Sequence, residues 1–159
     1  MYSHLEDFIY ELYTSIGVEK PEDLDMNKIA KNIGIKLVYK MRPFRLNNEI
    51  VLVRGTKQEE WMLFGHEVTH YIRHCGNQLN MHPLFRDLQE FQANHFAYHF
   101  CVPTFMLEEI KNVTANEIMN QFNVDFDFAL RRLEMFQNKL YFQSGYYIKK
   151  RNKVAVATK

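Results

Sequence analysis

The segment Phe64-Gly65-His66-Glu67-Val68-Thr69-His70 contains two histidines four residues apart, with a glutamate directly after the first. On a helix, residues four apart lie on the same face one turn from each other, so both imidazoles can reach one metal ion. The glutamate then lies beside the coordination position that the histidines leave open. This arrangement is typical of helices that hold a catalytic zinc ion and a general base.

The residues around this motif predict that it lies in the middle of a helix. A capping box at Thr56 and Glu59 indicates that the helix begins at Lys57, and the pattern continues to about His74. At 100° per residue, four large apolar residues form one stripe on the face away from the two histidines. These residues are Trp61, Phe64, Val68 and Ile72. One face is therefore expected to pack against the core while the other presents the imidazoles.

A catalytic zinc ion needs three protein ligands and one water, so a third ligand is expected on a neighbouring helix. Glu90 lies 20 residues after His70 and shares one helical face with Ala93, Asn94 and Ala97. The small residues on this face would let two helices approach closely enough for the carboxylate to reach the metal. Asn94 could accept a hydrogen bond from the second nitrogen of a ligand histidine and so fix the orientation of its ring.

Other signals define a mostly helical α+β domain. They predict helices over 4–16, 25–33, 83–102, 104–111, 114–121 and 125–138, a turn over 122–124, and strands over 35–39 and 49–53. Residues 140–149 alternate enough for a final strand or extended segment. We expect one domain over 1–148, with a catalytic core at about 25–103, a C-terminal helical part at about 104–138 and a basic, disordered tail over 149–159.

Composition favours a globular protein without a global charge that would attract nucleic acid. The chain has 159 residues, 47% of them hydrophobic, and a formal net charge of +1. The N-terminus has no basic and apolar signal segment, and no stretch approaches the ~18 apolar residues of a membrane span. Cys75 and Cys101 are isolated, which suits free thiols in a reducing compartment. We therefore expect a cytoplasmic protein without membrane contact.

Two segments together resemble the ImmA/IrrE-type metallopeptidases of prophages, integrative elements and DNA-damage responses. The first segment spans 64–74 and includes the histidine motif. The second is Glu90-Phe91-Gln92-Ala93-Asn94-His95-Phe96-Ala97, followed by Val102-Pro103. They match the family pattern of a His-Glu-x-x-His helix, then Glu-x-x-Ala-Asn-x-Phe-Ala, then an apolar run ending in proline. Weaker similarity covers 25–53 and 114–134.

The resemblance implies a zincin-like, gluzincin-type peptidase with one Zn²⁺ per chain. His66, His70 and Glu90 would be the metal ligands, and Glu67 would be the catalytic general base. Members of the family cleave helix-turn-helix repressors encoded nearby or relieve repression by them, so the expected partner is such a repressor. Its cleavage would release phage or mobile-element genes. The strand over 50–53 is expected to offer an edge to an extended peptide.

The residue that stabilises the oxyanion stays open at this level. Tyr71, His74, Tyr98 and His99 are candidates, and their sequence positions do not select one. His74 as a third metal ligand is excluded, because three residues at i, i+4 and i+8 spread over about 12 Å. His82 and His95 are expected to be surface or partly buried imidazoles, and both cysteines small buried groups.

Two other functions are considered. The chain could hold metal without proteolysis and act as an anti-repressor that binds the repressor. Alternatively, residues 114–137 could form a DNA-binding helix-turn-helix, but Asp125 and Asp127 lie where base-contacting residues belong. Acidic groups facing phosphate are unfavourable, so direct nucleic-acid binding is not expected. The sequence gives neither the oligomeric state nor the scissile bond.

Overall fold

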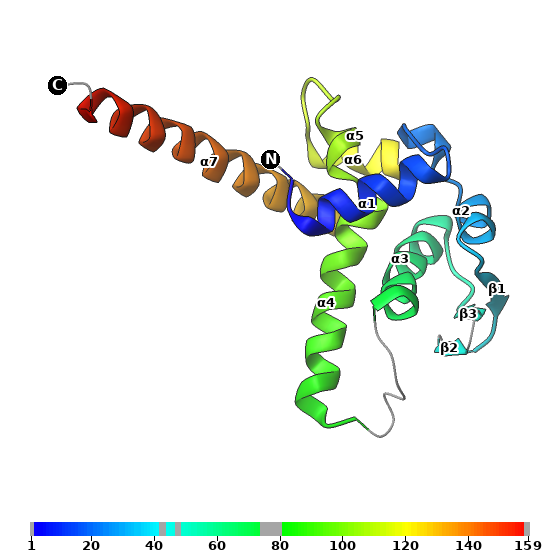
Figure 1. Ribbon diagram of the computed structural model, residues 1–159. Coiled ribbons are helices and arrows are strands. Elements are labelled where there is room, and N and C mark those ends of the chain that lie inside the picture. Colours follow the sequence, from blue (N-terminus) through cyan, green and yellow to red (C-terminus); the bar gives the residue numbers. More distant parts are fainter. Residues whose placement is uncertain (1, 42–43, 47–48, 74–80, 158–159) are drawn as a thin grey trace.

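Two antiparallel helices, α3 (Lys57–Arg73) and α4 (Pro83–Cys101), lie at the centre of the protein (Figure 1). The computed structural model describes residues 2–41, 44–46, 49–73 and 81–157. Helix α3 begins where the capping box predicted: Thr56 N–H donates to Glu59 Oε2 at 2.7 Å, and Glu59 N–H donates to Thr56 Oγ1 at 3.2 Å. The predicted apolar stripe packs inward, with Trp61, Phe64 and Val68 buried.

A small three-stranded sheet packs beside α3. It comprises β1 (Lys36–Tyr39), β2 (Phe44–Leu46) and β3 (Glu49–Leu52), in the order β1-β3-β2. Strand β3 pairs parallel with β1 and antiparallel with β2. The prediction that residues 50–53 offer a free edge is therefore wrong, because β3 has a strand on both sides. The sequence analysis also missed β2, a strand of only three residues.

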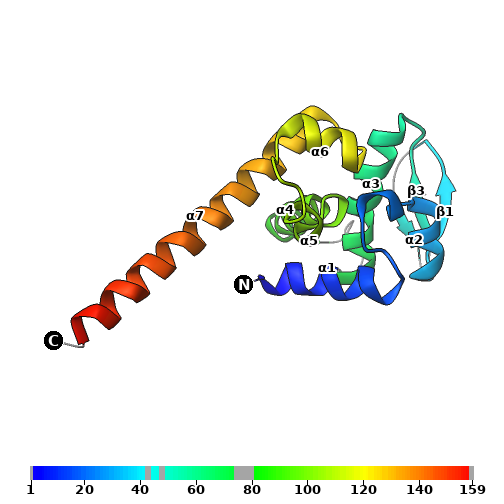
Figure 2. The same ribbon diagram turned by 90° about the horizontal axis from the view of Figure 1, so that it is seen from above.

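The two N-terminal helices lie close to their predicted ranges and begin at capping side chains. Helix α1 (His4–Ser15) carries the full capping box between Ser3 and Glu6, and the chain turns at Gly17 with a φ of +73°. A 3-10 turn, η1 (Pro21–Asp23), leads to α2 (Met26–Asn32), where Asp25 Oδ1 accepts from Lys28 N–H at 2.9 Å. Helix α1 lies against α4 and contributes the buried Ile9 and Tyr13 to the core (Figure 2).

The C-terminal part is mostly helical. It contains α5 (Thr104–Leu107), α6 (Ala115–Phe122) and α7 (Phe126–Ala157). A left-handed residue, Asn123, makes the turn before α7, and Asp125 Oδ1 caps that helix by accepting from Phe128 N–H at 2.8 Å. Helix α7 projects from the rest of the protein (Figures 1 and 2).

The expected strand or extended segment over 140–149 is wrong, because α7 continues through it. The same helix reaches Ala157, so the described part of the tail expected to be disordered is helical. Phe136 and Leu140 continue the helical four-residue spacing. Gly145 is the next helix-disfavouring residue, and a glycine inside a helix costs only about 1 kcal/mol relative to alanine.

A buried polar network ties α1 to the C-terminal helices. Thr104 Oγ1 donates to Glu6 Oε1 at 2.6 Å, and Arg132 Nη2 donates to Thr104 Oγ1 at 2.8 Å. Lys139 Nζ adds an ion pair to Glu6 Oε1 at 3.0 Å. Burial alone would raise the pKa of Glu6, but its hydrogen bonds and Lys139 outweigh burial and lower the pKa to about 2.

We expect Glu6→Gln to reduce the free energy of unfolding at pH 7 by about 3 kcal/mol, the value of a pKa lowered from 4.5 to about 2. Because the folded pKa is depressed, this stability is present above pH 4.5 and is lost as the pH falls towards 2. Urea unfolding of metal-free protein, followed by circular dichroism from pH 7 to pH 2.5, checks this. The variant and the wild type should converge as the pH falls. An equal difference at all pH values would contradict the prediction, and Glu11→Gln, an exposed site on the same helix, is the control.

Candidate metal centre

Three donor groups from α3 and α4 converge on one point. His66 Nε2 lies 3.1 Å from His70 Nε2 and 3.2 Å from Glu90 Oε2, and His70 Nε2 lies 3.5 Å from Glu90 Oε1. A tetrahedral zinc ion with bonds of 2.0–2.2 Å separates its ligand atoms by about 3.3–3.6 Å. The three predicted ligands therefore have donor atoms that zinc accepts, at separations within about 0.2 Å of this range. They are also a group that could hold a metal ion among the described residues.

Asn94 lies behind one of these histidines. Its Oδ1 is 2.9 Å from His66 Nδ1, on the side of the ring away from Glu90. An amide oxygen accepts a proton from Nδ1, and this tautomer leaves Nε2 with a free lone pair for a metal. The structure thus places the Asn94 side chain at hydrogen-bond distance from the His66 nitrogen that does not face the other donors.

Glu67, which lies between the two histidines in the sequence, is a buried residue with 8% of its surface exposed. Burial raises the pKa of Glu67; His66 opposes this shift and the nearby Glu90 carboxylate reinforces it. A carboxyl group with a raised pKa accepts and releases a proton more readily near neutral pH than an ordinary glutamate does. The electrostatics of Glu67 are therefore suited to proton transfer.

The residues that were candidates for oxyanion stabilisation have different neighbours in the structure. The Tyr98 ring lies 4.4 Å from that of Phe128 in α7. His99 points about 180° away from Glu90 around α4. Tyr71 packs against the core, and His74 lies outside the described residues. The role of these residues in oxyanion stabilisation stays a prediction.

His99 is a buried imidazole whose surroundings keep it neutral. Burial and the nearby guanidinium of Arg132 lower the pKa of His99 to about 3. Within the described residues, its Nδ1 has no hydrogen-bond partner. Two other histidines were expected to have no role in the site. His82 caps α4 by accepting from Leu84 N–H, and His95 stacks on Phe91. Cys101 is a buried free thiol, as expected, whereas Cys75 lies outside the described residues.

The first half of α4 exposes a group of large apolar side chains that the sequence analysis did not single out. They are between 50% and 72% exposed, and two of them, Leu88 and Phe91, flank Glu90 in the sequence; the others are Leu84 and Phe85. Helical spacing of apolar residues predicted a helix here but not its exposure. The sequence signal that could have indicated an interaction surface was the presence of four large apolar residues close to Glu90, because exposed apolar groups often mark interaction sites.

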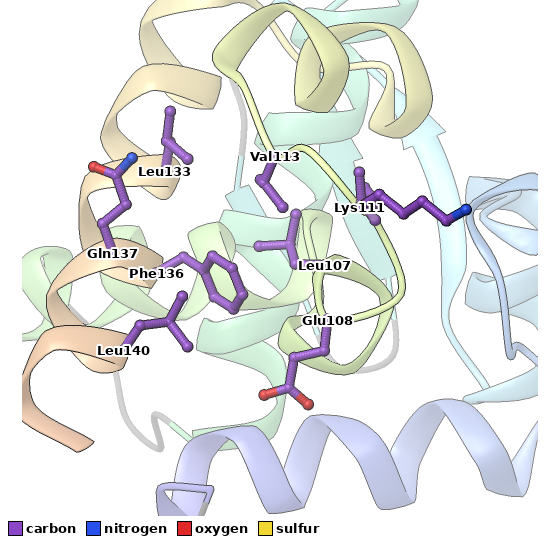
Figure 3. Close-up of a pocket in the computed structure, with 9 residues that line it drawn as sticks. Leu107, Glu108, Lys111, Val113, Leu133, Phe136, Gln137 and Leu140 are labelled. Carbon is purple, nitrogen blue, oxygen red and sulfur yellow. The ribbon is translucent and has the colours of Figure 1, made fainter. Parts of the chain in front are cut away.

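The candidate metal centre is separate from the pocket shown in Figure 3. That pocket has a volume of about 400 Å³ and lies between α7 and the segment from α5 to Val113. Its walls are mostly apolar, with Leu107, Leu133 and Phe136 among them. None of the three donor residues lines it.

The helical scaffold, the small sheet and the His-Glu-x-x-His helix define an α+β zincin-like domain. Comparison of the sequence with protein families gives the specific assignment: the chain belongs to the Peptidase_M78 family, whose model, described as an IrrE N-terminal-like domain, matches residues 22–134. The chain is thus a member of a peptidase family, as the resemblance predicted.

Two relatives come from Bacillus subtilis (strain 168). "Phage-like element PBSX protein XkdA" is 40% identical over 148 residues, which cover 86% of this chain and 75% of the relative. "Uncharacterized protein YqaB" is 34% identical over 149 residues, which cover 87% of each chain. No solved structure matches significantly. In the part of the chain that the structure describes, every helix is too short or too polar to cross a bilayer.

Proposed function

We propose that this protein is a zinc-dependent endopeptidase that makes a limited cut in a helix-turn-helix transcriptional repressor and so releases phage or mobile-element genes. The observation that carries the proposal is the convergence of His66, His70 and Glu90 at zinc-ligand separations. Glu67, a buried carboxyl group on the same helix, completes the set of groups that peptide hydrolysis needs.

Each residue has a defined part in this reaction. His66, His70 and Glu90 would hold one zinc ion per chain, and Asn94 would keep the His66 ring in the correct tautomer. Bound zinc would polarise the scissile carbonyl and lower the pKa of a water to about 7. Glu67 takes a proton from the attacking water and passes it to the leaving amine. Its raised pKa supports both halves of this transfer.

Two observations support a protein substrate from a phage-related setting. XkdA, the relative from the PBSX phage-like element, is similar over most of this chain. The exposed apolar residues of α4 lie beside Glu90, where a folded partner would bury them. A repressor bound to bacterial DNA is in the cytoplasm, so the protein would act there.

The test is mass spectrometry of a repressor encoded near the gene, after incubation with zinc-loaded protein. We expect one cut by the wild type and an intact repressor with Glu67→Gln. Absence of cleavage by the wild type, or cleavage that survives Glu67→Gln, would overturn the proposal. A stable complex with uncut repressor would identify an anti-repressor instead. Salt-dependent binding of duplex DNA would identify a DNA-binding regulator.

We expect Asn94→Ala to weaken zinc binding by about 10–100-fold, because loss of an outer-shell partner frees the ring of a ligand histidine. Competition with a chromophoric chelator measures the affinity. Gln92→Ala, an exposed position on the same helix, is the matched control and should retain wild-type affinity. Equal zinc affinity of Asn94→Ala and wild type would show that the contact with His66 does not support metal binding.

A further inference from the structure

We propose that Gly65 and Thr69, the residues directly before the two ligand histidines, are positioning residues that set the spacing of α3 and α4 at the metal centre. Each contacts α4 on the buried side of the helix pair. Their role is to hold Glu90 at ligand distance from both imidazoles. The inference rests on the metal binding in the proposed function, but not on the identity of the substrate.

Gly65 lies against the C-terminal part of α4. A Cβ atom at this position would lie 2.7 Å from Cys101 Sγ, 3.2 Å from Phe100 Cδ1 and 3.6 Å from Ala97 Cα. The first distance is a steric clash, and Cys101 and Phe100 are fully buried, so they have little room to retreat. A larger residue at position 65 therefore requires the Cys101 side chain, or α4 together with it, to move.

Thr69 makes a polar contact one turn further along. Its side chain is fully buried, and its hydroxyl lies 3.2 Å from Gly65 O in its own helix and 3.4 Å from Ala93 O in α4. A hydroxyl shared between two carbonyl oxygens inside the core is expensive to lose, because its removal leaves a packing defect and fewer hydrogen bonds. Thr69 thus links the two helices at the level of the ligands.

These contacts form a seam that runs parallel to the metal centre. In the seam, Gly65 faces Ala97 and Thr69 faces Ala93. In the metal centre, His66 faces Asn94 and His70 faces Glu90. Four residues forward in α3 correspond to four residues backward in α4 in both rows. The metal centre is therefore the seam displaced by one residue in α3 and by three residues in α4, and whatever widens the seam moves Glu90 and Asn94 away from α3 together.

A wider seam would affect the ligands unequally. His66 and His70 lie on the same helix, so their mutual distance depends only on α3. Glu90 comes from the other helix, and a site of this kind loses function when ligands move by about 0.5 Å. Widening should convert a three-ligand site into a two-ligand site.

The test compares zinc affinity, by chelator competition, in Gly65→Ala, Cys101→Ala and the double variant. We expect Gly65→Ala to bind zinc roughly 10–100-fold more weakly, as for the loss of ligand orientation. The zinc affinity of Cys101→Ala should stay near that of the wild type. The double variant should regain most of the affinity that Gly65→Ala loses, because it lacks the Cys101 Sγ atom that clashes with the new Cβ. Thr69→Val should also bind more weakly, and Thr69→Ser, which keeps the hydroxyl, should recover. Cobalt(II) spectra of each variant report whether the tetrahedral ligand field is retained.

A purely structural role predicts another pattern. Alanine favours helices over glycine by about 1 kcal/mol, so helix propensity alone would strengthen α3 in Gly65→Ala. Wild-type zinc affinity in folded Gly65→Ala, or no rescue by Cys101→Ala, would overturn the inference, as would a wild type that binds no zinc. Failure to cut a repressor would overturn the proposed function and leave these affinities unaffected.

Discussion

Glu67→Gln will slow peptide-bond cleavage by about 10²–10⁴-fold, the usual contribution of a general base, while zinc binding stays within a few-fold of wild type. An amide at this position keeps the volume of the buried carboxyl group but cannot accept a proton from water. Glu67 is also not one of the three converging donors. Single-turnover kinetics on a fluorogenic peptide that spans the cut site, together with zinc titration, separates the two effects.

The matched control for this change is Glu134→Gln, an exposed glutamate on α7 whose recorded ion pair is with Arg131. It should cleave at the wild-type rate. If Glu67→Gln retained more than a tenth of wild-type activity, another group would be the base. If it lost zinc together with activity, Glu67 would act through the metal ligands.

Chelation of zinc will lower the free energy of unfolding of the wild type by about 4 kcal/mol, relative to protein at free zinc 1,000 times the dissociation constant. In the proposed site, zinc would bind the folded arrangement of His66, His70 and Glu90, because these residues come from two helices. His70→Ala and Glu90→Ala should each remove most of this difference by leaving two ligands. Thermal and urea unfolding with zinc or with a chelator measure it.

His4→Gln, at the exposed start of α1, should respond to zinc and to chelator as the wild type does. An undiminished response in Glu90→Ala would place the third ligand elsewhere. A zinc-independent stability in the wild type would argue against a metal centre altogether.

Local signals in the sequence were sufficient for most of the fold. Ser3, Asp25, Thr56 and Asp125 cap helices near the predicted starts, because a side-chain oxygen that satisfies free N–H groups acts within three residues. Such signals do not depend on the rest of the fold. The element boundaries that they set are accordingly close to those observed.

The candidate metal centre was also accessible from sequence, for a different reason. The four-residue periodicity fixes which residues share a face of one helix, and the small residues around Glu90 indicated which face would meet α3. The distances among the three donors required the structure. So did the seam at Gly65 and Thr69, because the neighbours of a glycine are set by tertiary packing.

Features with weak or no local signal were missed or mistaken. Strand β2 pairs with its neighbour β3, with Leu46 opposite Glu49, but three residues are too few to show the alternation that indicates a strand. Apolar and polar residues alternate weakly over 140–149, but this segment continues the helix α7 instead of forming a strand. The pairing of Glu6 with Lys139 spans 133 positions, and the sequence carries no signal for it.

The network around Glu6 determines how much of the chain can fold by itself. The family match begins at residue 22, yet the buried Arg132 inside it finds its counter-charge on α1. The pKa of Arg132, lowered to about 10 by burial, still leaves the guanidinium charged at neutral pH. A fragment cut to 22–134 would lack α1, so the core residues that pack against Ile9 and Tyr13 would be exposed. Arg132 would then lose the opposite charge of Glu6. We therefore expect the autonomous folding unit to extend beyond the segment that matches the peptidase family at both ends, from Ser3 to at least Lys139.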